Sequence, residues 1–288
     1  MKHFEHTTLS EFSKRNYDSR LNNWTEYLKK PLSAIIKDPK GSFDLLKSVK
    51  DLTHTEVTYH LYLNSIVSYM KHNPVKVDEK VKEEWTRLAR GNSEVIQEHY
   101  KENKPSELQK DKVMSWKDIE SVRDKLSDGI PKLLLSMYTL LEPERADYFE
   151  CELISRGQKA TSANYINLSD SKLVITDFKT AKKYDKLEQD IPPELMRQIT
   201  LSITNEPRQY LFINRFKKPF ERPQYSNWAN RVLSEIFGKP ITLTILRHAY
   251  CSKLDFNAPL KSLEAISKRM GHDVGTQKRY QWINEVVE

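Results

Sequence analysis

The feature that most constrains the fold of this chain is a polar stretch near its middle, KENKPSELQKDKV at residues 101–113. The stretch is charged and almost without apolar side chains, so it cannot bury surface in a core. A chain of 288 residues also exceeds the size that a single core usually serves. We therefore predict a helical domain at 1–100, a linker at 101–115 and a second domain at 116–288.

The first of these domains shows helical periodicity. Apolar residues between Phe12 and Leu28 recur every three to five positions after the capping residues Thr7–Ser10, which is the spacing of a helix face. A second helix is predicted through Leu61–Met70 and a third over about 77–100. The aromatic residues are most simply core residues. The lysines and arginines between them suit either a DNA-facing helix or a solvated surface.

The second domain has a different pattern. Strands are expected at 164–168 and 172–178 on either side of a turn, with a third candidate strand at 186–191. Expected helices lie at about 116–126, 130–141, 193–203, 225–237, 242–254 and 259–270. The last of them ends at Gly271, a residue suited to a left-handed helix cap. The predicted fold class is mainly α with a small antiparallel sheet in the second domain.

Charge and composition restrict the class of protein. The net charge of +7 favours an anionic partner, with nucleic acid, a membrane surface or a merely solvated basic face all open. The two cysteines, Cys151 and Cys251, are far apart and indicate neither a disulfide framework nor a zinc site. With only seven glycines, the chain has no GxGxxG or GKS/T phosphate loop.

Targeting segments are not evident either. The start, MKHFEHTTLSEFSK, lacks the apolar core of a signal peptide, and the longest apolar-rich stretch, 133–141, is too short to span a bilayer. We expect an intracellular soluble protein.

Five polar residues could converge on one reaction. A tyrosine can act as a covalent nucleophile when it is deprotonated and its target is surrounded by positive charge. Tyr280 stands among cations near the end of the chain. Arg145 and Arg247 could hold the non-bridging oxygens of a phosphodiester bidentately, His272 follows the expected helix cap, and Lys179 closes the expected strand.

Each candidate has a simpler structural interpretation. Arg145 could pair with Asp147, and Lys179 could be one of many surface lysines. His272 could be a hydrogen-bonding residue at a helix end, while His248 is expected to be a packing residue. The order of the candidates along the chain is more specific than any one of them.

That order resembles the tyrosine recombinase, or phage-type integrase, family. The resemblance covers about 116–286 and is strongest in LRHAY, KRMGH and TQKRYQW. The positions that match the family's arginine, hairpin lysine, second arginine, histidine and tyrosine are Arg145, Lys179, Arg247, His272 and Tyr280. The segment PERADY at 143–148 is also similar to a motif of recombinases from large DNA viruses and their satellites, which points to a viral or mobile-element source.

The resemblance implies a fold and a reaction. The two domains would close as a clamp around double-stranded DNA, with a homo-tetramer assembled on the DNA. Tyr280 would attack the scissile phosphate to give a 3′-phosphotyrosine, and the two arginines would stabilise the charged phosphorane. His272 would bind a non-bridging oxygen and Lys179 would protonate the leaving oxygen. Neither ATP nor metal would be needed.

The sequence departs from the family pattern at two positions. The histidine expected three residues before Arg247 is Thr244, a possible pocket residue that cannot act as a base. His248, the residue after Arg247, would point about 100° away from Arg247 on a helix, so we do not expect it to compensate. The acidic residue expected three positions after the first arginine is Tyr148, with Asp147 one position earlier. The second departure leaves the local support of the first arginine open.

Three alternatives remain open from the sequence. A type IB topoisomerase uses nearly the same residues but relaxes supercoils without exchanging strands between sites. A DNA-binding module without catalysis is the second, and a structural or interaction protein with a solvated basic face is the third.

Overall fold

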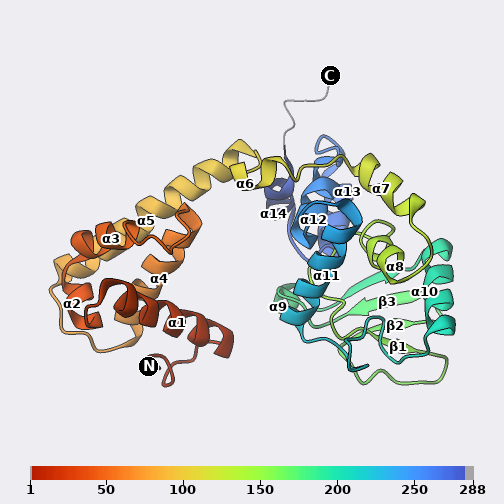
Figure 1. The fold of residues 1–288 in the computed structure, drawn as a ribbon, viewed down its shortest axis with the longest axis horizontal. Helices are drawn as coiled ribbons and strands as arrows, with labels where there is room; N and C mark the ends of the chain where they lie inside the picture. The colour runs from red at the N-terminus through yellow and green to blue at the C-terminus, as the bar shows by residue number, and fades with distance from the viewer. Residues whose placement is uncertain (1, 283–288) are drawn as a thin grey trace. The chain divides into compact units, whose positions relative to one another are not determined.

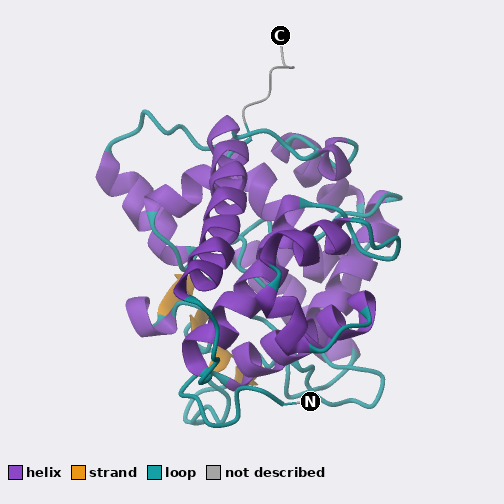
Figure 2. Cartoon of the chain, turned by 90° about the vertical axis from the view of Figure 1, so that its left-hand side faces the viewer, coloured by secondary structure: helices purple, strands orange, loops and turns teal. Residues whose placement is uncertain are grey.

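The computed structural model describes residues 2–282, and of residues 107 and 108 only the backbone. The end of the predicted second domain, 283–288, lies outside the described residues. The chain divides into two compact units, unit 1 (Met1–Glu102) and unit 2 (Asn103–Glu288). Helices predominate, and the strands are confined to one small part of the chain (Figure 2).

Unit 1 is helical throughout its regular structure (Figure 1). Its helices are α1 (Glu11–Leu28), α2 (Leu32–Lys37), α3 (Pro39–Lys47), α4 (Glu56–His72) and α5 (Glu79–Glu102). The Ser10 side chain caps α1 by accepting a hydrogen bond from the Ser13 amide. The predicted helices correspond to α1, α4 and α5. Helices α2 and α3 were not predicted because six and nine residues are too few to show a clear period.

The core of unit 1 is built around two tryptophans. The rings of Trp24 and Trp85 are both fully buried, and they meet edge to face with centroids 5.7 Å apart. Each indole N–H donates to a backbone carbonyl, that of Tyr62 for Trp24 and that of Ile36 for Trp85. The indoles thus bury a large apolar area without leaving a polar atom unpaired.

Unit 2 is a mixed unit in which helices surround a small sheet. Its helices are α6 (Glu107–Lys110), α7 (Trp116–Lys125), α8 (Ile130–Met137), α9 (Ala181–Tyr184), α10 (Pro193–Asn205), α11 (Arg222–Phe237), α12 (Leu243–Ser252), α13 (Leu260–Arg269) and α14 (Val274–Tyr280). Figure 1 shows α8 and α10 beside the sheet and α12 to α14 on the other side of the unit. The first of these helices, α6, lies inside the range expected as a linker.

The sheet has the order β1-β2-β3-β4, and it corrects the predicted antiparallel sheet. Its strands are β1 (Glu152–Ile154), β2 (Asn164–Asn167), β3 (Lys172–Ile175) and β4 (Leu187–Asp190). Strand β1 pairs with β2 in parallel, whereas β2–β3 and β3–β4 are antiparallel. Strand β1 was not predicted because its three residues are all buried and show no alternation of buried and exposed positions. The sheet is therefore mixed.

Two predicted boundaries near the candidate residues are also corrected. Strand β3 ends at Ile175 rather than at Phe178, so Lys179 does not directly follow a strand. The last helix, α14, begins at Val274 and is capped by Asp273, whose carboxylate accepts from the Thr276 amide. The sequence by itself predicts a flexible turn at 273–275, followed by a short helix with Thr276 as its N-cap. Asp273 instead starts the helix one turn earlier, because its side chain is the better N-cap acceptor.

Candidate active site

Arg247 is the most buried of the candidate residues. It lies on α12 with 1% of its surface exposed. One terminal nitrogen donates to the Pro143 carbonyl at 2.5 Å, and the other lies 3.5 Å from Nδ1 of His272. The third nitrogen, Nε, is buried and has no hydrogen-bond partner among the described residues. Burying a guanidinium with an unused N–H is costly, so this donor is a feature that requires explanation.

His272 lies beside this guanidinium and is 3% exposed. It follows Gly271, whose φ of +67° lets the chain leave α13 abruptly. Burial and the charges of Arg247 and Arg145 lower the pKa of His272 to about 3. The ring is therefore neutral near pH 7. Arginine can only donate, so Nδ1 accepts and Nε2 carries the proton. Nε2 too has no partner among the described residues.

Tyr280, the last residue of α14, lies against both groups. The Arg247 guanidinium carbon is 5.0 Å from the centre of its ring, and the His272 ring centre is 5.8 Å away. Burial raises the pKa of the phenol, but the charges of Arg247 and Arg145, with hydrogen bonds from both side chains, outweigh it. The net pKa is below that of an ordinary tyrosine. The surroundings of Tyr280 thus favour the phenolate.

Arg145 lies on the segment between α8 and β1, which we call the arginine loop (residues 142–150). Its side chain is half-buried and bonds the Tyr280 phenol, and its carbonyl accepts from the Tyr138 hydroxyl at 2.7 Å. Asp147 forms an ion pair with Arg222 of α11 rather than supplying the partner that the simpler interpretation gave to Arg145. Arg145 is thus left to face the tyrosine.

Lys179 lies between β3 and β4 in a segment that we call the lysine loop (residues 176–186). The side chain is exposed, and no described residue accepts a hydrogen bond from its ammonium group. The loop is held near His272, because the Thr180 hydroxyl donates to the Gly271 carbonyl at 2.5 Å and Lys183 pairs with Asp273 at 3.3 Å. The structure places the lysine loop beside the arginine and histidine cluster.

Thr244 lies in the first turn of α12 with an exposed side chain. No hydrogen bond or ion pair joins it to the cluster of Arg145, Arg247, His272 and Tyr280 within the described part of the chain. The structure thus brings four of the five matched residues together, anchors the loop of the fifth nearby, and leaves Thr244 facing solvent.

His248 is a site residue whose role the sequence did not indicate. Its Nδ1 lies 2.8 Å from the Tyr280 carbonyl, to which it must donate, and its ring stacks on Trp282 at 4.2 Å. Burial lowers the pKa of His248 to about 4, so it is neutral. The Ser252 hydroxyl accepts from the Trp282 amide at 2.8 Å. These contacts fix the end of α14 on α12. The one sequence feature that could have indicated this role is that His248 directly follows Arg247 on the same helix.

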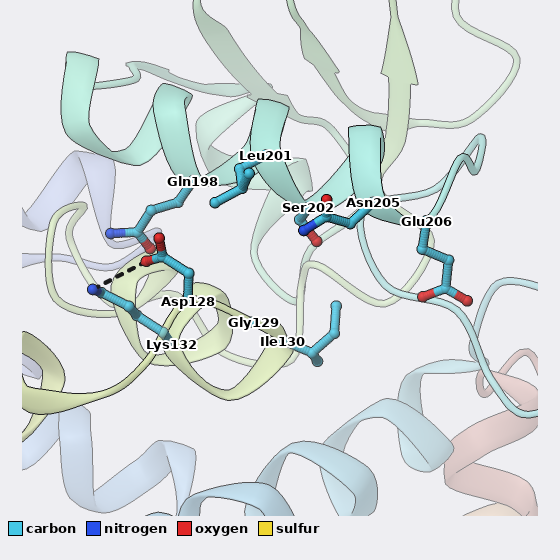
Figure 3. Close-up of a pocket in the computed structure, with 9 residues that line it drawn as sticks. All are labelled: Asp128, Gly129, Ile130, Lys132, Gln198, Leu201, Ser202, Asn205 and Glu206. Atoms are coloured by element: carbon cyan, nitrogen blue, oxygen red, sulfur yellow. Dashed lines mark ion pairs between the residues drawn. The ribbon is translucent and has the colours of Figure 1, made fainter.

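A separate cavity of unit 2 lies away from this cluster. It has a volume of about 130 Å³ and lies between the start of α8 and α10, with the Asp128–Lys132 ion pair at its edge (Figure 3). None of the candidate residues lines it. In residues 2–282 no helix is both long and apolar enough to cross a membrane, and no group of three or more His, Cys, Asp or Glu side chains is arranged to hold a metal ion.

Comparisons with known proteins give little independent information. No family model matches the sequence, and no curated protein matches it. Among solved structures, the chain is similar to that of a XerA recombinase, with a TM-score of 0.46 and 14% identity over 96% of this chain and 89% of that one.

Proposed function

We propose that the chain is a DNA strand transferase of the tyrosine recombinase type, in which Tyr280 is the nucleophile. The observation that carries this proposal is a pair of buried, unused N–H donors beside an activated phenol. Arg247 Nε and His272 Nε2 both lack acceptors among the described residues. They lie next to a tyrosine whose pKa two guanidiniums lower. A phosphodiester placed there would supply the missing acceptors and present its phosphorus to the phenol.

The proposed reaction exchanges the bond from phosphorus to the 5′-oxygen for a bond from phosphorus to the tyrosine oxygen. The Tyr280 oxygen, after losing its proton to solvent water, attacks phosphorus while the bond from phosphorus to the 5′-oxygen breaks. Arg145, Arg247 and the neutral His272 donate to the non-bridging oxygens, where negative charge grows in the transition state. Lys179 gives its proton to the departing 5′-oxygen. The product is a 3′-phosphotyrosine and a free 5′-hydroxyl, and the reverse steps rejoin the strand.

The neutral state of His272 matters for this role. Because its pKa is about 3, the ring cannot act as a proton-bearing cation near pH 7. Its contribution is a single N–H donor, held in place by the acceptor role of Nδ1 toward Arg247. Replacement of His272 by another donor such as tryptophan should therefore retain part of the activity, whereas phenylalanine should not.

Binding of double-stranded DNA is the second part of the proposal. The net charge of +7 supports it, as does an exposed basic turn of unit 2, Arg215–Lys218, with Phe216 exposed at 67%. Unit 1 would contribute further phosphate contacts in a two-domain clamp, and exchange between two sites would require a tetramer on the DNA. Such activity would take place inside a cell in contact with DNA, in the nucleus, in the host cytoplasm or in association with a virus.

The test is a suicide duplex that carries a nick close to the cleavage site. Loss of the short 5′-hydroxyl fragment traps the covalent complex, which denaturing electrophoresis resolves as a slower protein band. Wild type should form this band without added metal or ATP, and Tyr280→Phe should not. Tyr165→Phe, on β2, is the matched control and should behave as wild type. A band that persists in Tyr280→Phe would refute the assignment of the nucleophile.

Recombination and DNA relaxation are separated by a second measurement. Both use the same covalent intermediate, but only a recombinase transfers strands between two duplexes. A mixture of differently labelled duplexes should therefore give exchanged products. Relaxation of supercoiled plasmid without exchange would instead assign the chain to the type IB topoisomerase class, and DNA binding with no covalent band would indicate a non-catalytic module.

A further inference from the structure

The side-chain amide of Asn164 makes all the hydrogen bonds of which it is capable, although the residue belongs to no predicted site. The residue begins β2 and is 1% exposed. Its Nδ2 donates to the carbonyls of Asp147 at 2.8 Å and Asp177 at 3.1 Å. Its Oδ1 accepts from the amides of Thr176 at 3.0 Å and Asp177 at 2.9 Å. An asparagine side chain can make four such bonds, and here all four go to backbone groups.

The partners of this amide belong to the two loops that carry site residues. Asp147 lies two residues after Arg145 in the arginine loop, and Asp177 lies two residues before Lys179 in the lysine loop. Arg222 joins the same two aspartates from α11, because it pairs with the Asp147 carboxylate and donates to the Asp177 carbonyl at 3.0 Å. Two independent links therefore set the distance between the loops.

We propose that Asn164 is a positioning residue that holds the lysine loop against the arginine loop, so that the Lys179 ammonium reaches the leaving oxygen. The inference rests on the proposed strand-transfer reaction and adds to it a residue that touches neither DNA nor the reacting atoms. The juxtaposition matters because Lys179 itself has no partner among the described residues to fix its place.

Loss of Asn164 should disturb the lysine more than the arginine. The arginine loop has other anchors, since the Pro143 carbonyl accepts from Arg247 and the Arg145 carbonyl accepts from Tyr138. The lysine loop takes three of the four hydrogen bonds of Asn164, and they all lie at its first two residues. Two other anchors of this loop, from Thr180 to Gly271 and from Lys183 to Asp273, come after Lys179 in the chain. The expected defect is therefore in protonation of the leaving group and not in charge stabilisation.

Two variants of Asn164 and one matched control test whether this residue positions the lysine loop. Asn164→Ala removes all four bonds. Asn164→Asp keeps the shape and the oxygen that accepts from two amides, but it replaces the donating NH2 by a carboxylate oxygen, which then faces two carbonyls. Asn167→Ala is the control, because Asn167 lies on the same strand and its Oδ1 likewise accepts from the backbone amides of a turn, those of Ser169 and Asp170. That turn carries no site residue.

The readout compares two substrates in full-length protein. On ordinary suicide duplex, both Asn164 variants should form the covalent band about a hundredfold more slowly, the scale for small misplacement of a reacting group. With sulfur in place of the bridging 5′-oxygen, the leaving group departs without a proton, so their rates should return close to that of wild type. Asn167→Ala should match wild type on both. Equal slowing of the Asn164 variants on both substrates, or no slowing on either, would overturn the proposal.

Hydrogen exchange gives a second, activity-free measurement. Among the described residues the Asp177 amide donates to Asn164 alone, so its protection should fall in Asn164→Ala and persist in Asn167→Ala. Unchanged protection would show that Asn164 does not hold the loop. If wild type forms no covalent band, the proposed reaction fails and with it the catalytic purpose of the link, whereas a lost Asp177 protection still identifies Asn164 as the residue that orders the loop.

Discussion

Substitution of Gly271 by alanine should destabilise unit 2 through two separate effects. The first is conformational, because φ is +67° at this position, a region that L-residues with a Cβ adopt only with strain. The second is crowding. An added Cβ would lie 3.2 and 3.3 Å from two ring carbons of Phe178 and 3.4 Å from a methyl group of Leu187. Both neighbours are buried and have little room to move.

The conformational and crowding contributions to the loss of stability can be separated with Gly238. This residue follows α11 with a φ of +63°, and no atom lies within 4 Å of a Cβ added to it. Gly238→Ala should therefore cost only the conformational part, about 1–2 kcal/mol. Gly271→Ala should cost that amount plus about 1–3 kcal/mol for crowding. For a unit of this size each kcal/mol lowers Tm by about 2–4 °C. The Gly271 variant should therefore lose roughly twice as many degrees as the Gly238 variant.

Differential scanning calorimetry of the full chain measures the loss of Tm in both variants, Gly271→Ala and Gly238→Ala. Gly91→Ala serves to assign the transitions, because Gly91 lies inside α5 of unit 1 with open space around it. That substitution should raise the unit 1 transition by favouring helix, with about 1 kcal/mol of stabilisation. Equal losses for Gly271→Ala and Gly238→Ala would refute the crowding argument. No loss for either would refute the conformational one as well.

Four further outcomes are expected of the site. Arg247→Lys should slow cleavage by at least about a hundredfold, the scale for losing one preorganised donor, while filter binding shows DNA affinity retained, because a point charge cannot replace the fork. Thr244→His should leave Tm unchanged, since the side chain is exposed, and a fall in Tm would contradict that placement. Cleavage by wild type should rise with pH through the lowered pKa of Tyr280. In Arg145→Ala the pKa should be higher, so the rate–pH profile should move to more alkaline pH, and an unmoved profile would contradict the assigned charge effect. Lys179→Ala should lose about 10²–10⁴-fold on ordinary DNA and recover on the 5′-phosphorothiolate, where Arg247→Lys stays slow.

Much of the local structure could be predicted from the sequence, because its causes are local. Apolar residues at helical spacing predicted α1, α4 and α5, and the polar turn residues between two β-rich runs predicted the β2–β3 pair. Gly271 at the end of a periodic segment predicted a left-handed cap, which its φ of +67° confirms. The order of the five candidate residues along the chain likewise needed only the sequence, although their roles remain a proposal.

Contacts between distant segments were decided only by the tertiary structure. The parallel pairing of β1 with β2 depends on where a three-residue strand is carried by the surrounding chain. The proton on His272 Nε2 follows from Arg247, which lies on α12, 25 residues earlier in the chain. The amide of Asn164 meets two loops that the sequence separates by 30 residues at Asp147 and Asp177. Contacts between segments that are distant in sequence determine the hydrogen-bond partners and the burial of each side chain, and these in turn cause the pKa shifts. Periodicity and turn signals describe only neighbours in sequence, so they could place each candidate on its element but not beside the others.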